Sequence, residues 1–321
     1  MLACPRCGST YQREVVYCGL DGEKLVHVES DPLLGRTIDR YAIEGVLGDG
    51  GMARVYRARH VHLAQPFAVK VLFGDMASDR GLAERFRREA MSAAQIKHPN
   101  VVAVTDFGVS PEGLSFMAME LLTGPTLNEV RRQGPTPLTP ARIAALMKQI
   151  VAGLGAAHAL GFVHRDLKPK NIMVVNEGIT QLVKILDFGL VRTIDTGDAR
   201  LTQQGQIFGT PAYMAPEQIS EAEVDARTDL YALGAILYEL LSGRPPFVGT
   251  MTEIFRKHLY EAPAPLSDVS GLGELAMVLL SKEKNARPRG AQEVLEIILS
   301  LIHISEPTRL RRISYAVFCL K

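Results

Sequence analysis

Residues 164–171 read His-Arg-Asp-Leu-Lys-Pro-Lys-Asn, and sixteen residues after Asn171 the chain reads Asp187-Phe188-Gly189. The acid of the first string, Asp166, can accept a proton from a hydroxyl group. Asn171 and Asp187 can hold divalent cations through oxygen atoms, and Lys168, the first of the two lysines between Asp166 and Asn171, can steady a phosphate. Together these side chains supply what the transfer of a γ-phosphoryl group requires.

A glycine-rich stretch lies upstream, where Gly48, Gly50 and Gly51 precede Val55. Glycines there let backbone N–H groups approach phosphate oxygens without an intervening side chain. By itself such a string is more often an ordinary hairpin turn. Its meaning therefore depends on the residues that accompany it.

Ala68-Val69-Lys70 ends in a lysine on a predicted strand, and Glu89 follows nineteen residues later in a predicted helix. Most strand lysines simply face solvent. A half-buried lysine without a counter-ion loses its charge readily, which gives a pairing of Lys70 with Glu89 a physical purpose. Glu84 is the competing partner.

These strings, in this order, resemble the motifs of the bacterial eukaryotic-type Ser/Thr protein kinases over most of the chain. One departure is Ala53, which stands where the family has its third glycine; we expect a tighter loop that still binds nucleotide. The resemblance implies an α+β bilobe, with a small β-rich lobe before a larger helical lobe and the active site in the cleft between them. It also implies ATP and Mg²⁺ as cofactors and Ser/Thr hydroxyl groups of proteins as acceptors.

The resemblance also implies a role for each matching residue. Asp166 is the base, Lys168 neutralises charge on the γ-phosphate, and Lys70, oriented by Glu89, contacts the α- and β-phosphates. Met119 is the residue before a hinge, although plain core packing explains a methionine there equally well. The backbone of Glu120 and Leu122 would bind adenine. The implied nucleotide and Mg²⁺ contacts are Leu47, Gly48, Gly50, Gly51, Val55, Ala68, Lys70, Met119, Glu120, Leu122, Asn171 and Asp187.

Residues 191–214 are expected to form an activation segment that ends at Ala215-Pro216-Glu217. A phosphate on this segment would give Arg165 a dianion to bind. Thr202 is the first candidate acceptor, before Thr193 and Thr196, and Thr210 is expected to contact Asp166 and Lys168. Three further residues have expected structural roles: Glu217 pairs with Arg287, and Asp229 holds the backbone of the catalytic loop.

Hydrophobic spacing places these residues on elements. Short strands are predicted at 41–47, 53–59, 67–73, 101–107 and 114–121, and a helix over 80–97. A long helix follows Pro140, with Ile143, Leu146, Ile150, Leu154 and Ala157 on one face. Residues 230–241 are apolar nearly all round, which predicts a helix buried on every side. The predicted kinase domain is 41–298, divided into lobes of 41–121 and 122–298.

Residues 1–30 contain Cys4, Cys7 and Cys18, whose spacing resembles the knuckles of a zinc ribbon. The fourth ligand is not a cysteine: Asp21 has the right spacing, and His27 is the alternative. A metal-free or redox-sensitive cluster is the competing interpretation. Residues 31–40 are interpreted as a linker.

The remaining features are bulk properties and the end of the chain. A net charge of +1 over 321 residues gives no reason to expect nucleic acid as a partner, and no apolar run is long enough for a membrane span. We expect a cytoplasmic location, unless a lost C-terminal part anchors the intact protein, and self-association for autophosphorylation is an open option. Residues 299–321 resemble a translated sequencing adapter, so they are expected not to fold and the true C-terminus is expected to be missing.

Two rival functions remain at this point. A pseudokinase would bind nucleotide without turnover, and only Ala53 and the truncated end favour it. Alternatively, binding through the cysteine-rich segment could be the main activity, with the kinase part secondary.

Overall fold

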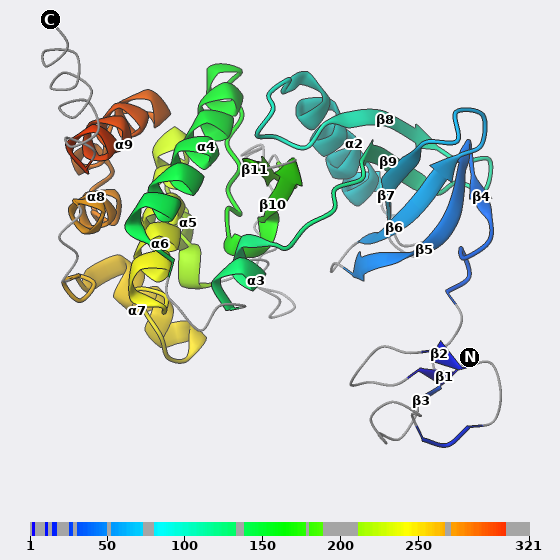
Figure 1. The fold of residues 1–321 in the computed structure, drawn as a ribbon, viewed down its shortest axis with the longest axis horizontal. Helices are drawn as coiled ribbons and strands as arrows, with labels where there is room; N and C mark the ends of the chain where they lie inside the picture. The colour runs from blue at the N-terminus through cyan, green and yellow to red at the C-terminus, as the bar shows by residue number, and fades with distance from the viewer. Residues whose placement is uncertain are drawn as a thin grey trace, which may run out of the picture.

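The computed structural model describes residues 2–3, 10–11, 15–17, 26–27, 31–49, 53–72, 80–132, 138–177, 180–188, 211–266 and 271–305. Figure 1 shows a twisted β-sheet with one long helix beside it at one end of the molecule, and a group of helices at the other end. The two lobes follow each other along the chain. This α+β arrangement agrees with the predicted order of a β-rich lobe before a helical lobe.

The N-terminal lobe is built on a six-stranded antiparallel sheet of order β4-β5-β6-β7-β9-β8. Buried and exposed residues alternate along β6, as expected for strands with two different faces. Each predicted strand of this lobe is present, shifted by a few residues at most. The strands are β4 (Thr37–Ile38), β5 (Tyr41–Asp49), β6 (Ala53–His60), β7 (Pro66–Leu72), β8 (Val104–Val109) and β9 (Ser115–Glu120).

Apolar side chains gather on both faces of this sheet. On one face lies a cluster that includes Tyr56, Val71 and Phe116. On the other face, the helix α2 (Arg80–Gln95) contributes Phe86 and Ala90 to a second cluster. Helix α2 lies where the sequence predicts a helix. Its apolar residues recur at helical spacing, so one stripe of the helix can pack on the sheet.

The C-terminal lobe is organised around α4 (Pro140–Ala159) and α6 (Ala226–Ser242). Every residue of α6 from Thr228 to Leu240 is buried, as its all-round apolar sequence predicted. Asp225 caps its first turn by accepting from the Arg227 backbone N–H, and Gly243 ends it with a left-handed φ of 78°. All five apolar residues predicted for the inner face of α4 are buried.

Smaller elements complete this lobe. A hairpin of β10 (Ile172–Glu177) and β11 (Thr180–Ile185) lies next to α4, after the short 3-10 helix η1 (Pro169–Asn171). The other elements are α3 (Leu127–Arg132), η2 (Pro211–Tyr213), α5 (Pro216–Ile219), α7 (Met251–Tyr260), α8 (Leu272–Leu279), η3 (Lys284–Ala286) and α9 (Ala291–Ser305).

The interpretation of residues 31–40 as a linker is wrong. Thr37–Ile38 pairs with β5 as the edge strand β4, and the Ile38 side chain is buried in the sheet's apolar cluster. A two-residue strand is too short to produce a period-two pattern. The turn formers Asp31 and Pro32 just before β4 indicated a loop instead.

The predicted end of folded structure at residue 298 is also too early, because α9 continues to Ser305. Leu301 packs against the helical core, where its side chain lies beside Gly271. The apolar residues after 298 continue the helix face of Ala291, Val294 and Ile298, so the helix does not stop there. Residues 306–321 lie outside the described residues.

At the N-terminus, Leu2–Ala3 (β1), Thr10–Tyr11 (β2) and Val26–His27 (β3) form a three-stranded antiparallel sheet of order β2-β1-β3. Cys4, Cys7, Cys18 and Asp21 lie outside the described residues, so the sheet carries no information on a metal. Among the described residues, no helix combines the length and apolar character that crossing a membrane needs.

Candidate active site

Lys70 connects the two lobes. Its Nζ atom, on β7, lies 2.8 Å from Oε1 of Glu89 on α2 and 3.0 Å from Oδ1 of Asp187, which follows β11. The predicted partner of Lys70 is therefore confirmed against the alternative, because Glu84 pairs instead with Arg87 and Arg88 on the surface. The pairing brings three residues predicted for phosphate and metal chemistry into direct contact.

The opposite charges of Lys70 and its two carboxylate partners stabilise this largely buried contact. Burial opposes the ammonium charge, but Asp187 and Glu89 outweigh it and hold the pKa of Lys70 above its ordinary value. The nearby Lys70 ammonium lowers the pKa of Asp187, so this carboxyl group stays ionised. The Asp187 side chain is 40% exposed, which leaves the carboxylate accessible to a ligand.

The second part of the site is the loop around Asp166. Its Oδ2 atom lies 2.6 Å from Nζ of Lys168, and Asn171 Nδ2 donates to the Asp166 carbonyl oxygen at 3.0 Å. Lys170, between Lys168 and Asn171, is exposed, so its side chain faces solvent. The backbone N–H of Leu186 donates to the Asn171 carbonyl oxygen at 2.8 Å, which ties this loop to the segment that carries Asp187.

Two residues of the site have left-handed backbone conformations, Arg165 with φ of 65° and Asp187 with φ of 47°. Such conformations cost about 1–3 kcal/mol in residues other than glycine, and they persist where surrounding contacts enforce them. For Arg165 that contact is Asp229 on α6: its Oδ1 accepts from the Arg165 N–H, and its Oδ2 accepts from the His164 N–H, both at 2.8 Å. The predicted hold of Asp229 on this loop is present.

The residues predicted to surround adenine lie together. Val55, Ala68, Met119 and Leu122 fall in one apolar cluster on the α2 side of the sheet. Ala68 stands directly opposite Met119 in the pairing of β7 with β9. Leu47 and Gly48 lie at the exposed end of β5, and Gly50 and Gly51 lie outside the described residues.

Glu120 has a role that the sequence did not reveal. Its Oε1 atom accepts from Lys184 Nζ on β11 at 2.7 Å and from the Ala103 backbone N–H at 2.7 Å. The side chain therefore joins the end of β9 to the C-terminal lobe, while its backbone remains in the expected hinge. The sequence shows only that a carboxylate lies at the predicted hinge, and it does not indicate that Lys184 is its partner.

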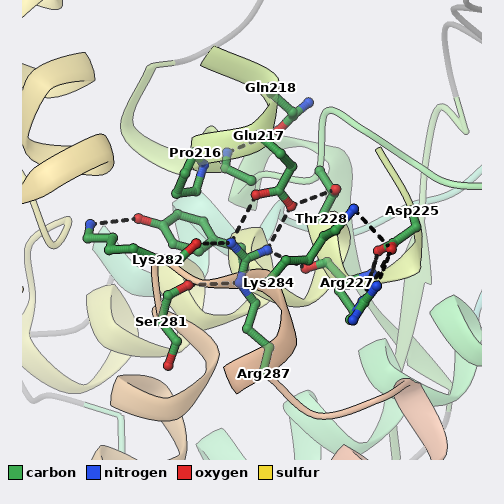
Figure 2. Close-up of polar contacts among 12 residues, drawn as sticks. Pro216, Glu217, Gln218, Asp225, Arg227, Thr228, Ser281, Lys282, Lys284 and Arg287 are labelled. Carbon is green, nitrogen blue, oxygen red and sulfur yellow. Dashed lines mark hydrogen bonds and ion pairs between the residues drawn. The ribbon is translucent and has the colours of Figure 1, made fainter. Parts of the chain in front are cut away.

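The predicted pair of Glu217 and Arg287 is present, and Figure 2 shows Arg287 surrounded by acceptors. Its two terminal nitrogens donate to the Glu217 carboxylate at 2.7 and 2.9 Å. Carbonyl oxygens of Ser281, Lys282 and Arg227 accept its remaining donors. This fully buried guanidinium anchors α5, the first helix after the predicted activation segment, to the chain just before α9.

Most of the predicted activation segment, including Thr202, Thr210, Thr193 and Thr196, lies outside the described residues. Residues 211–214 at its end are described, and just after it Gln218 on α5 donates to the Arg165 carbonyl oxygen at 2.7 Å. The chain after the segment therefore contacts the catalytic loop directly.

The donor set of the site fits Mg²⁺. This ion prefers oxygen ligands and commonly takes one or two protein groups together with phosphates. Asp187 offers an accessible carboxylate, and Asn171 uses its amide nitrogen on the Asp166 carbonyl, which leaves its amide oxygen as the ligand atom. Within the described ranges, no group of three His, Cys, Asp or Glu side chains could hold a metal ion.

Comparison with known proteins defines the class. Residues 41–312 match the protein kinase domain, so the chain belongs to the protein kinase family. Its curated relatives include the serine/threonine-protein kinases pkn2 of Myxococcus xanthus, 38% identical over 81% of this chain, and PknB of Mycobacterium tuberculosis, 39% identical over 84%. The chain covers 32% of pkn2 and 44% of PknB, so it spans about a third to a half of these relatives.

Solved structures give the same answer. The PknI kinase domain of Mycobacterium tuberculosis, solved as a double mutant, superposes with a TM-score of 0.67 at 26% identity. That match covers 84% of this chain and 98% of the PknI chain. The predicted protein-kinase fold and family are thus confirmed.

Proposed function

We propose that this chain is an ATP- and Mg²⁺-dependent protein kinase that transfers the γ-phosphoryl group of ATP to Ser and Thr hydroxyl groups. The observation that carries the proposal is the bridge from Lys70 to Glu89 and Asp187, because it joins both lobes through the groups that phosphoryl transfer needs. The names of pkn2 and PknB, both serine/threonine-protein kinases, support the choice of acceptor.

The nucleotide would lie against the α2 side of the sheet. Val55, Ala68, Met119 and Leu122 offer an apolar surface to adenine. The Glu120 N–H already donates to the Ala103 carbonyl oxygen, so the Glu120 carbonyl oxygen and the Leu122 backbone would offer the hydrogen bonds. The loop after β5 would place backbone N–H groups on the phosphates. Lys70, kept charged by its two carboxylates, would contact the α- and β-phosphates.

Asp187 and Asn171 would hold Mg²⁺, which when bound neutralises charge on the phosphates. Asp166 orients the acceptor hydroxyl and takes up its proton. As the bond between the hydroxyl oxygen and the γ-phosphorus forms, the bond from that phosphorus to the β–γ bridging oxygen breaks and ADP leaves. Lys168, beside Asp166, compensates the charge of the transferred group.

The test is phosphoryl transfer from labelled ATP to a generic basic protein by wild type and Asp166→Asn. Asparagine keeps the shape but cannot take the proton, so we expect transfer to fall by about 100-fold or more while nucleotide binding persists. Thermal unfolding of both proteins controls for folding. Equal transfer would remove Asp166 from its role, and a wild type that binds ATP without transfer would favour the pseudokinase.

Regulation by phosphorylation of the activation segment belongs to the same proposal. Thr202 is the first candidate acceptor, and Arg165 would bind the resulting phosphate. Thr210 would shape the substrate site, and self-association would allow one copy to phosphorylate another. Mass spectrometry after incubation with ATP, in wild type and Thr202→Ala, checks the acceptor.

The finer proposals for the two ends rest on the sequence. We propose a zinc site at Cys4, Cys7 and Cys18, with Asp21 or His27 as the fourth ligand. Metal analysis of freshly purified protein tests it, and a stoichiometry near zero rejects it. We also propose that residues 299–321 derive from adapter sequence, although the first seven are helical; resequencing the locus decides this.

The part described here would work in the cytoplasm, where ATP and protein substrates are available. A part of the natural protein beyond this chain could anchor it to a membrane, and the same resequencing would reveal such a segment.

A further inference from the structure

Asp31 lies upstream of the region that matches the kinase domain, which begins at residue 41. Its side chain is only 5% exposed. It accepts hydrogen bonds from the Leu33 backbone N–H and the Tyr56 hydroxyl, both at 2.8 Å, and from the Arg54 guanidinium. Burying a carboxylate is costly unless it is paired. The burial of Asp31, which lies outside the matched kinase domain, therefore suggests a specific role for this residue.

Arg54 gives Asp31 a connection to the nucleotide-binding loop. Arg54 Nη1 donates to Asp31, and its Nε donates to Asp49. Asp49 and Arg54 are paired across β5 and β6, at the two ends of the glycine-rich loop. The Arg54 guanidinium therefore links the two strand ends at which this loop begins and ends, and Asp31 binds the same guanidinium.

The sheet geometry places this cluster on the face away from the nucleotide. Arg54 and Tyr56 are alternate residues of β6, so their side chains lie on the same face. Tyr56 and Leu33 belong to the apolar cluster on that face, whereas Val55 belongs to the cluster on the opposite side. Asp31 therefore contacts the strand that carries the loop on the face of the sheet opposite to the nucleotide, so it does not touch the substrate.

Relative exposure decides which contact of Arg54 dominates. The Asp49 side chain is 59% exposed, and exposed ion pairs contribute little to stability. The Asp31 carboxylate is buried and fixed by two further donors, so it is the stronger anchor. A cavity of about 290 Å³ lies between residues 31–33 and the sheet, so close packing alone does not hold this segment in place.

We propose that Asp31 is a positioning residue for nucleotide binding: it fixes Arg54, and Arg54 with Asp49 fixes the two strand ends, on β5 and β6, that carry the glycine-rich loop. The inference deepens the proposed kinase function and rests on it. It makes the N-terminal segment part of the nucleotide-binding lobe.

The test compares Asp31→Asn with wild type in the full chain. Asparagine keeps one oxygen for the Leu33 N–H, but it puts an N–H₂ group in place of the oxygen that accepts from Tyr56 and Arg54, and it loses the charge that binds Arg54. We expect the KM for ATP and the Kd for ADP, measured by direct titration, to rise about three- to tenfold, with kcat changed less than twofold. Arg54→Met should do the same, and the double variant should be no worse than either single one, because both act through one contact.

Asp106→Asn is the matched control. Asp106 accepts from the Tyr41 hydroxyl at 3.0 Å and lies 3.7 Å from Arg40, at the other end of β5 from the glycine-rich loop. It should lower stability without changing ADP affinity. Unchanged ADP affinity in Asp31→Asn, or an equal loss in both variants, overturns the inference. A wild type that binds ADP but transfers no phosphate rejects the kinase function while leaving this test valid.

Discussion

At the scale of single residues, the site depends on a few carboxylates with several partners each. Asp229 accepts from the backbone N–H groups of His164 and Arg165, and its Oδ2 atom lies 2.8 Å from Nε2 of His158. Asp187 and Glu89 show the reverse arrangement, in which two carboxylates share one cation, Lys70. Buried carboxylates are stable only with such complete pairing, so each one fixes the geometry of the groups that it pairs with.

Replacing Asp229 by asparagine should reduce catalysis by misplacing the loop. The new amide presents one N–H₂ group to donors that need an acceptor, which releases part of the loop from α6. We expect kcat to fall about 100-fold, since small displacements of catalytic groups have effects of that size. Steady-state kinetics together with ADP titration measures this, and ADP affinity should change little.

Asp225→Asn is the control on the same helix. Asp225 caps the first turn of α6 and pairs with Arg227 near the surface, away from the catalytic loop. It should cost at most about 1 kcal/mol of stability and leave kcat within twofold. If the two variants lose the same kcat, general destabilisation rather than loop position explains the effect.

At the scale of elements, pairs far apart in sequence hold the lobes in shape. Glu217 at the start of α5 and Arg287 before α9 form a buried ion pair across 70 residues. Glu120 at the end of β9 similarly contacts Lys184 on β11. Such contacts fix how helices and strands meet, and thereby fix where the catalytic loop and the chain after the activation segment lie.

Arg287→Met should destabilise the helical lobe strongly. It leaves the Glu217 carboxylate buried without its counter-ion, and breaking a buried pair in this way costs about 3–5 kcal/mol. Urea unfolding followed by circular dichroism gives the free energy of unfolding. Arg256→Met removes a solvent-exposed pair with Glu261 and should cost less than about 1 kcal/mol. Similar losses in both variants would contradict the importance of burial.

At the scale of the whole molecule, stability should depend on pH through His258 on α7. Nδ1 of this fully buried ring lies 2.8 Å from the Tyr231 hydroxyl, and the ring packs against Phe247. Burial, and secondarily the Lys282 ammonium, lowers the pKa of His258 to about 4. The unfolded chain, with an ordinary histidine pKa near 6.5, therefore takes up the proton first as the pH falls.

The sign follows from this difference. The stabilising contribution is complete above about pH 6.5 and is lost as the pH falls towards 4, by about 3 kcal/mol at most. Thermal unfolding between pH 7.5 and 5 should show this loss in wild type and a smaller one in His258→Gln. The exposed His62→Gln should behave as wild type. An identical pH dependence in all three proteins would exclude His258 as the cause.

The sequence by itself determined the reactive residues and most helices and strands, because short motifs and local apolar periodicity are enough to identify both. Lys70, Asp166, Asn171 and Asp187 were recognisable by their motifs, and the helices of the C-terminal lobe by their apolar periodicity. The choice of Glu89 over Glu84 came from the family's spacing, and the geometry agreed with it.

Only the tertiary structure decided which distant groups meet. The contact of Asp31 with Arg54, the bond of Glu120 to Lys184 and the packing of Leu301 on Gly271 depend on how the sheet twists and how helices pack. None of these residues belongs to a motif that names its partner. Such contacts arise from three-dimensional proximity, and a periodic pattern along one strand or helix specifies only which face is buried.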